Sequence, residues 1–96
     1  MAQFDIYRVR GGELAVDCQA DLLDDLPTRL VAPLRSSHDA KVGRLTPGFT
    51  VAGEHLTMLT PLVRGISPRD IEETIGSLRD HEYAIKIALD MLISGF

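Results

Sequence analysis

Apolar residues alternate with polar ones through the first two-thirds of the chain and recur at helical spacing in the last third. Alternation predicts strands, and a repeat at three and four residues predicts helix. Strands that come first and a helix that comes last favour an antiparallel barrel or sheet with the helix at one end. This order of elements limits the fold more than any other feature of the sequence.

The length of 96 residues predicts one small domain, residues 1–96. The apolar fraction of 45% is sufficient for a core, although a short chain buries a small share of its surface and oligomerisation would relieve that. The net charge of −4 argues against nucleic-acid binding, which needs a basic footprint. An acidic surface instead suits a basic protein partner.

Cys18 is the only cysteine, so the sequence predicts neither an internal disulfide nor a cysteine-built zinc site. This fits a reducing cytoplasm. The first residues, Met1–Asp5, contain no charged leader and no apolar core, so we expect no signal peptide. No apolar run approaches the length of a membrane span.

Two strands joined by Gly11-Gly12 form the first predicted hairpin. In the first strand, Phe4 and Ile6 face one side and Tyr7 and Val9 the other. In the second strand the residues alternate again. We expect Leu14, Val16 and Cys18 to point inward and Asp17 and Gln19 to point outward.

Residues 28–34 predict a third strand with Leu30, Ala32 and Leu34 on its inner face. Pro33 places this strand at an edge, or marks its end, because proline cannot donate to a sheet. A second hairpin is predicted from residues 49–51 and 56–60, with Gly53-Glu54 at its turn. Residues 35–46 show weak periodicity and predict a surface loop with room for a short strand.

Ser67–Asp70 has the composition of a helix start. Ser67 can cap, Pro68 suits the first helical position, and Asp70 favours the positive end of a helix. The next apolar residues recur at helical spacing, and they are Ile71, Ile75 and Leu78. We expect Gly76-Ser77 to interrupt this segment.

Asp80 is the predicted cap of a second, longer helix. Its apolar stripe consists of Ile85, Leu89 and Leu92. The helix runs almost to the last residue and ends in the apolar stretch Met91–Phe96. Such an end must be buried, lie at a subunit interface, or serve as an apolar contact for a partner.

No catalytic or metal-binding pattern stands out. His38, His55 and His81 are far apart in the sequence and predict surface positions. Four acidic residues between positions 17 and 25 are interpreted as a solvated edge, because a hard-cation site needs several converging oxygens. No nucleophile elbow or phosphate loop occurs. The residues therefore favour an interaction protein, without metal or cofactor, over an enzyme.

Three stretches together resemble the CcdB family of bacterial gyrase-poison toxins. The first is Gln3–Tyr7, the second is Val16–Asp24 followed by Arg29–Leu34, and the third is Leu78 with Glu82–Asp90 and the small-Gly-apolar tail. Residues 58–60 match as well. The resemblance covers nearly the whole chain.

The resemblance implies a mainly β (α+β) protein: a small SH3-like antiparallel β-barrel with a C-terminal α-helix, paired as a homodimer. It implies that the helix ends lie at the dimer face, bind the A subunit of DNA gyrase and trap gyrase on cleaved DNA. An antitoxin with a disordered C-terminal segment would neutralise the toxin. The implied gyrase-binding residues are Leu22, Leu23, Glu82, Asp90, Ile93, Ser94, Gly95 and Phe96.

Two positions depart from the family pattern. Ser94 stands where the pattern has a tryptophan that stacks on arginines of gyrase, and a serine has no ring for such a stack. Asp90 stands where the pattern has a neutral amide. Gyrase as the target is therefore better supported than strong poisoning.

Two alternatives remain open. A sister family of toxins shares the barrel and cuts messenger RNA, which needs an acid and a base near an arginine. The candidates for such a site are Arg8, Arg10, Arg29 and Arg35 with Asp17 or His38. The other alternative is a homologue that has lost poisoning and only binds an antitoxin.

Overall fold

The computed structural model describes residues 1–95, and its architecture confirms a mainly β protein with a C-terminal helix. The strands are β1 Asp5–Val9, β2 Leu14–Asp17, β3 Arg29–Ser36, β4 Gly48–Val51, β5 Glu54–Met58, β6 Arg64–Ile66 and β7 Ile71–Ser77. Short 3-10 helices connect them: η1 Asp21–Leu23, η2 Thr60–Leu62, η3 Pro68–Asp70 and η4 Arg79–His81. The α-helix α1 spans Glu82–Ser94.

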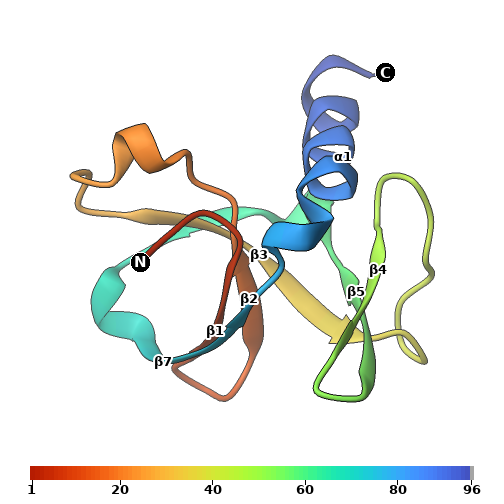
Figure 1. Ribbon diagram of the computed structural model, residues 1–96, viewed down its shortest axis with the longest axis horizontal. Helices are drawn as coiled ribbons and strands as arrows, with labels where there is room; N and C mark the ends of the chain where they lie inside the picture. The colour runs from red at the N-terminus through yellow and green to blue at the C-terminus, as the bar shows by residue number, and fades with distance from the viewer. Residues whose placement is uncertain (96) are drawn as a thin grey trace.

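All strand pairs in the sheet are antiparallel, in the order β4-β5-β3-β2-β1-β7, with β6 paired to one end of β3. The sheet curls strongly, and α1 rises from one side of it (Figure 1). The long strand β3 lies at the centre of the sheet and contacts three partners, β2, β5 and β6. The sheet therefore forms a curled barrel whose first and last strands in the order are β4 and β7.

Both faces of the sheet are buried, which explains the alternation in β1. Phe4 and Ile6 join the larger core on the α1 side. Tyr7 and Val9 join a smaller cluster on the other side, against which Ile66 and Ile71 pack. The predicted division of the first strand into two faces is thus confirmed, and each face has its own cover.

Glycines at positive φ close both predicted hairpins. Gly11 and Gly12 have φ values of 96° and 88° between β1 and β2, a conformation that other residues rarely adopt. The second turn lies one residue earlier than predicted, at Ala52-Gly53, both with positive φ. The two positive φ angles at Ala52-Gly53 suit the right-handed twist of this two-residue hairpin.

Pro33 does not mark an edge or a strand end, contrary to the prediction. It lies inside β3, opposite Ala15 of β2. On its other side β3 changes partner, from β6 up to Val31 to β5 from Leu34 onward. The carbonyl of Pro33 accepts a hydrogen bond from Leu59 N–H on this side, so the missing N–H of the proline also faces the junction between two partners.

The predicted helix after Ser67 is wrong. Ser67 does cap a short turn, since its Oγ accepts from Arg69 N–H, but the turn is η3 and the chain then enters strand β7. A spacing of four residues fits a strand as well as a helix, and Ile71, Thr74 and Ile75 are β-branched. Irregular register in the β1–β7 pairing moves Ile71 and Ile75 to different clusters.

The helix α1 exists as predicted, but Asp80 does not cap it. His81 is the N-cap and makes no side-chain cap bond, while Ser77 Oγ accepts from Arg79 N–H at the start of the preceding η4. Ile85 and Ala88 are buried in the core, and Leu89 packs partly against it. Leu92, the last member of the predicted stripe, is 38% exposed, because the outer end of α1 extends past the sheet.

Leu30 is likewise exposed, contrary to its predicted place on the inner face of the third strand. It does share a face of β3 with Ala32 and Leu34, which are buried. Its partner across the β3–β6 pair is Gly65, which offers no side chain to cover it. The strand face is therefore assigned correctly, but the core stops before this end of β3.

Leu78 and Leu22 provide a matched test of the core, because one is buried and the other is exposed. We expect Leu78→Ala to lower the free energy of unfolding by about 2–5 kcal/mol, through lost transfer energy and a residual cavity. Leu22→Ala should change it by less than about 0.5 kcal/mol. Urea unfolding at one fixed protein concentration measures both, and equal losses would contradict the described core.

Candidate functional site

The outer end of α1 presents an apolar side chain to solvent. Ile93 is 81% exposed, and Ser94 and Gly95 after it are exposed as well. Gly95 ends the helix in the left-handed conformation, with φ 80°, and its N–H donates to the carbonyl of Met91. Within residues 1–95 no atom outside the chain neighbours of Gly95 lies within 4 Å of the position of a Cβ there, so backbone conformation and not space requires glycine.

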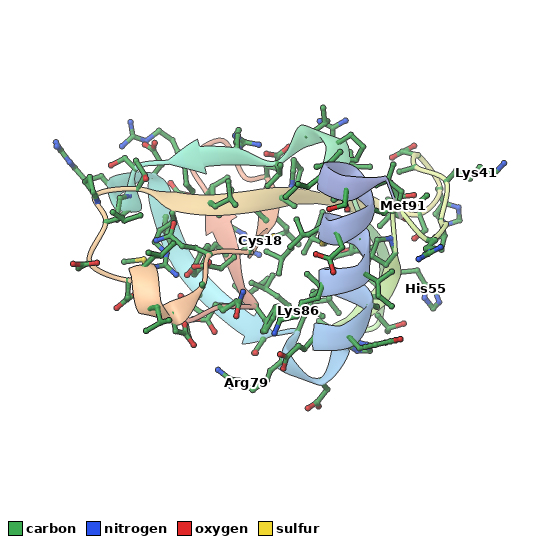
Figure 2. The ribbon with its side chains drawn as sticks, turned by 90° about the horizontal axis from the view of Figure 1, so that it is seen from above. Cys18, Lys41, His55, Arg79, Lys86 and Met91 are labelled. Carbon is green, nitrogen blue, oxygen red and sulfur yellow. The ribbon has the colours of Figure 1, made fainter. Side chains whose placement is uncertain are left out.

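Two predicted acidic residues lie on the same helix. Glu82, in the first turn of α1, forms an ion pair with Lys86 one turn later, with 2.6 Å between Oε2 and Nζ. Asp90 is exposed near the outer end. Lys86 and Met91 lie on opposite sides of α1 in Figure 2, with Met91 on the side of the loop that carries Lys41.

Leu22 and Leu23 lie on η1, which is separated from α1 in both views (Figures 1 and 2). Leu22 is 93% exposed and Leu23 is 48% exposed. Of the predicted residues, α1 and its C-cap thus carry Glu82 in the first turn and Asp90, Ile93, Ser94 and Gly95 toward the other end, whereas the two leucines lie elsewhere on the chain. Phe96, the remaining predicted residue, lies outside the described residues.

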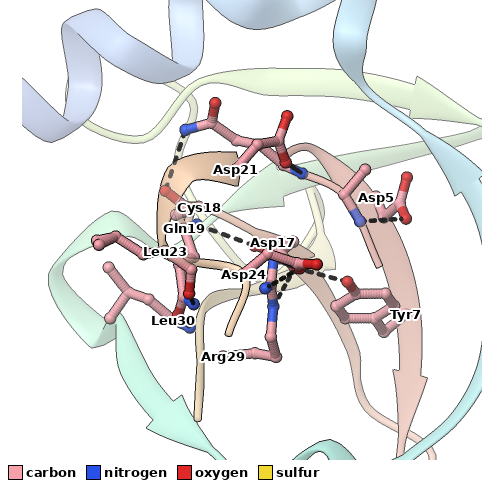
Figure 3. Close-up of polar contacts among 12 residues, drawn as sticks. Asp5, Tyr7, Asp17, Cys18, Gln19, Asp21, Leu23, Asp24, Arg29 and Leu30 are labelled. Atoms are coloured by element: carbon pink, nitrogen blue, oxygen red, sulfur yellow. Dashed lines mark hydrogen bonds and ion pairs between the residues drawn. The ribbon is translucent and has the colours of Figure 1, made fainter. Parts of the chain in front are cut away.

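A buried ion pair lies beneath the loop that carries η1 (Figure 3). Asp17 is fully buried and Arg29 is 1% exposed. The Arg29 guanidinium donates from Nε and Nη2 to Oδ2 of Asp17, at 2.9 and 2.7 Å. Tyr7 donates its hydroxyl proton to the same oxygen at 2.6 Å, and Gln19 N–H donates to Oδ1. Asp17 therefore accepts four hydrogen bonds.

This burial contradicts the predicted outward position of Asp17 and Gln19. The alternation is correct, but the face that was expected to meet water is the second buried face of the sheet. The third nitrogen of Arg29, Nη1, donates a hydrogen bond to Oδ1 of Asp24 at 2.7 Å. This network was not predicted from the sequence. The one signal for it in the sequence is that Asp17 and Arg29 lie in two neighbouring apolar strands.

The network shifts the protonation of its members. Burial raises the pKa of Tyr7 far above its ordinary value, and the hydrogen bond to Asp17 raises it further. For Arg29, burial lowers the pKa, but the hydrogen bonds and the charge of Asp17 outweigh it, so the pKa is raised overall. Tyr7 therefore remains a neutral donor and Arg29 remains a cation.

Cys18 is a buried core residue, as predicted. Burial raises the pKa of its thiol from 9.0 to about 12, and the nearby charge of Asp17 acts in the same direction. A buried, protonated thiol is a poor nucleophile. The residue packs, and its environment does not activate it.

The three histidines lie at the surface, as predicted. The His81 ring packs against Phe49 with 5.0 Å between ring centroids, and His55 Nδ1 contacts the Thr50 hydroxyl. Within residues 1–95 no cluster of three His, Cys, Asp or Glu side chains could hold a metal ion.

The residues considered for RNA cleavage are not assembled in one open site. Arg29 and Asp17 are buried against each other. Arg8 pairs with Glu73 at 3.3 Å, and Arg10 lies 3.6 Å from Asp70. Arg35 approaches Glu13, which also pairs with Arg64. Arg8, Arg10 and Arg35 therefore each lie within 4 Å of a carboxylate and not beside a common acid and base.

None of the helices within residues 1–95 is long and apolar enough to cross a bilayer.

The family model described as "CcdB protein" matches residues 3–95. The chain belongs to the CcdB family. It is thus a toxin-family protein of toxin–antitoxin systems, a class that implies an antitoxin partner. The curated proteins contain no match to the sequence.

Among solved structures, the fold is similar to that of the Mycobacterium tuberculosis toxin MazF-mt6. The TM-score is 0.77 and the sequence identity is 13%, with 94% of this chain and 96% of that chain covered. At this identity the likeness concerns the fold alone. It confirms the small barrel expected from the order of strands and helix.

The buried thiol of Cys18 predicts a loss of stability at alkaline pH. The unfolded thiol releases its proton above about pH 8.5. The folded thiol keeps its proton up to a pH of about 12. Proton release by the unfolded state favours unfolding, so this contribution to stability decreases as the pH rises between the two values.

Urea unfolding from pH 7 to pH 10.5 measures this effect. The wild type should lose stability with a steeper slope than Cys18→Ala, which lacks the thiol. Identical slopes would contradict the burial of Cys18.

Proposed function

We propose that the chain, as a single toxin domain of residues 1–96, is the toxin of a type II toxin–antitoxin system that binds the A subunit of DNA gyrase and inhibits the enzyme. The observation that carries this proposal is the exposed outer end of α1, where Ile93 is 81% exposed on a helix anchored at its other end. An apolar side chain held beyond the core is available for contact with a protein partner. Gyrase acts on the chromosome, so the proposed action is cytoplasmic.

The proposed binding surface combines apolar and acidic groups. Leu22, Leu23 and Ile93 supply exposed apolar area. Glu82 and Asp90 supply carboxylates for basic groups of the partner. Phe96 adds an aromatic ring that would contribute a large contact area. Binding of this kind inhibits an enzyme through shape and charge, and it requires no catalytic residue, cofactor or metal.

Ser94 limits how strongly the chain should poison gyrase. Its side chain is exposed, which is the environment that a stacking residue needs, but it offers only a hydroxyl group. Loss of an arginine stack removes about 0.5–2 kcal/mol of binding free energy. We therefore place gyrase binding ahead of strong trapping of cleaved DNA.

The proposed antitoxin carries a disordered C-terminal segment that wraps the toxin and blocks the gyrase surface. A homologue that only binds this antitoxin would share the whole fold, and Ser94 is the residue that favours it. Binding to gyrase separates these two functions, because the inactive homologue would not bind.

The second candidate is an endoribonuclease toxin with the same barrel. The fold likeness to MazF-mt6 is the observation that supports it. The burial of Asp17 and Arg29, and the net charge of −4, oppose it. A supercoiling and DNA-cleavage assay with purified gyrase, run beside an RNA-cleavage assay, distinguishes the two.

We expect a homodimer in solution. Leu92 on α1 and Leu62 on η2, which contacts α1, are exposed apolar side chains that a second copy would cover. Sedimentation at micromolar concentration should show a dimer, and Leu62→Asp should shift it toward monomer. Leu26→Asp is the matched control, since Leu62 and Leu26 are 49% and 45% exposed and Leu26 lies in the η1 loop. A wild-type monomer would contradict the dimer.

Removal of the last three residues, 94–96, should abolish gyrase binding and leave the fold and the dimer intact. The reason is that Ser94 and Gly95 lie beyond the part of α1 that packs on the core. Calorimetry gives the melting temperature and the affinity for the dimerisation domain of the A subunit. A large drop in melting temperature, with dissociation to monomers, would show that the tail is structural.

A further inference from the structure

Leu22 and Leu23 are held on an element that has no core of its own. The 3-10 helix η1 has three residues, none of them buried. An isolated turn of this size samples many conformations, because little buried apolar area offsets its conformational entropy. The side chains around it must therefore supply the order that packing does not.

Arg29 links η1 to the interior of the sheet. Two of its nitrogens donate to the fully buried Asp17, and the third, Nη1, donates to Asp24 at 2.7 Å. Asp24 is the C-cap of η1 and directly follows Leu23. Its side chain is 59% exposed, whereas that of Arg29 is 1% exposed. The arginine thus connects a rigid buried group to the exposed end of η1.

Gln19 holds the same segment from a second side. Its Nε2 donates to the carbonyl of Leu23 at 2.7 Å, and its Oε1 accepts from Leu30 N–H at 3.0 Å. One side chain therefore joins the end of η1 to the start of β3. At the other end of η1, Asp21 Oδ1 accepts from Gln3 N–H at 2.8 Å. Figure 3 shows these contacts around the loop that carries η1.

We propose that Asp24 and Gln19 are positioning residues that fix Leu22 and Leu23 in the conformation that the protein partner binds. This inference rests on the proposed function. A loop ordered in advance loses less conformational entropy on binding, so its affinity is higher at the same contact area. The buried ion pair is the fixed point, and Asp24 transmits its position to the two leucines without contacting the partner.

Asp24→Ala tests the proposal, with Asp25→Ala as the matched control. The two variants remove the same charge from adjacent residues of one loop, but only Asp24 accepts from Arg29. We expect Asp24→Ala to weaken binding to the dimerisation domain of the gyrase A subunit about three- to tenfold, and Asp25→Ala to leave it within about twofold. Equal effects of the two variants would overturn the proposal.

Asp24→Asn separates positioning from direct charge contact. Asparagine keeps an oxygen that can accept from Arg29 but has no charge. It should retain most of the affinity and fold normally. If Asp24→Asn loses as much affinity as Asp24→Ala, Asp24 acts through its charge on the partner, and the positioning role is wrong.

A double-mutant cycle shows whether Asp24 acts through the leucines. In a variant that already carries Leu22→Ala and Leu23→Ala, Asp24→Ala should cause little further loss, because there is nothing left to position. Additive losses would overturn the proposal. Amide hydrogen exchange in the isolated protein adds a readout without gyrase: the Leu23 and Asp24 amides should exchange faster in Asp24→Ala than in Asp25→Ala.

The two proposals fail in different ways. If the wild type does not bind gyrase, the proposed function is wrong, while the exchange data still show whether Asp24 orders η1. If the wild type binds and Asp24→Ala behaves as Asp25→Ala does in both assays, only the positioning role is wrong.

Discussion

The buried pair of Asp17 and Arg29 is the contact on which the first half of the structure depends. Removing a charged side chain from water costs on the order of several kcal/mol for each ion. Only close pairing, together with further hydrogen bonds, offsets that cost. Here Tyr7 from β1 and the backbone of Gln19 complete the set around Asp17. Loss of any donor would leave part of a buried charge unmatched, so β1, β2 and β3 must keep one relative arrangement.

That arrangement explains how a short chain forms a sheet with two buried faces. The larger face is covered by α1 through Ile85 and Ala88. The smaller face is covered by the segment that contains Ile66 and Ile71. The buried polar network of Asp17 and Arg29 lies next to this cluster and joins it through Tyr7. A small residue such as Ala88 lets the helix approach the sheet closely, so a few contacts near its start can anchor it. The end of α1 beyond Leu89 is left largely free of the core and available to a partner.

The sequence predicted the elements whose signals are local. Alternation and paired glycines determine the β1–β2 hairpin, and the helical repeat before the tail determines α1. The prediction was wrong where a local pattern fits two structures, as at Ile71 and Ile75, whose spacing suits helix and strand alike. Pro33 was misplaced because the junction of two partner strands along β3 is a property of the whole sheet, which no local rule describes.

The candidate site shows the same division between local and distant causes. The positions of the tail residues follow from the helix and from Gly95, whose positive φ sets the direction in which the chain leaves α1. Both could be expected from the sequence. The leucines of η1 instead depend on side chains from β2, β3 and the loop between them, which only the folded sheet brings together. The family resemblance identified these leucines, but their physical support, through Arg29, Asp24 and Gln19, became visible only in three dimensions.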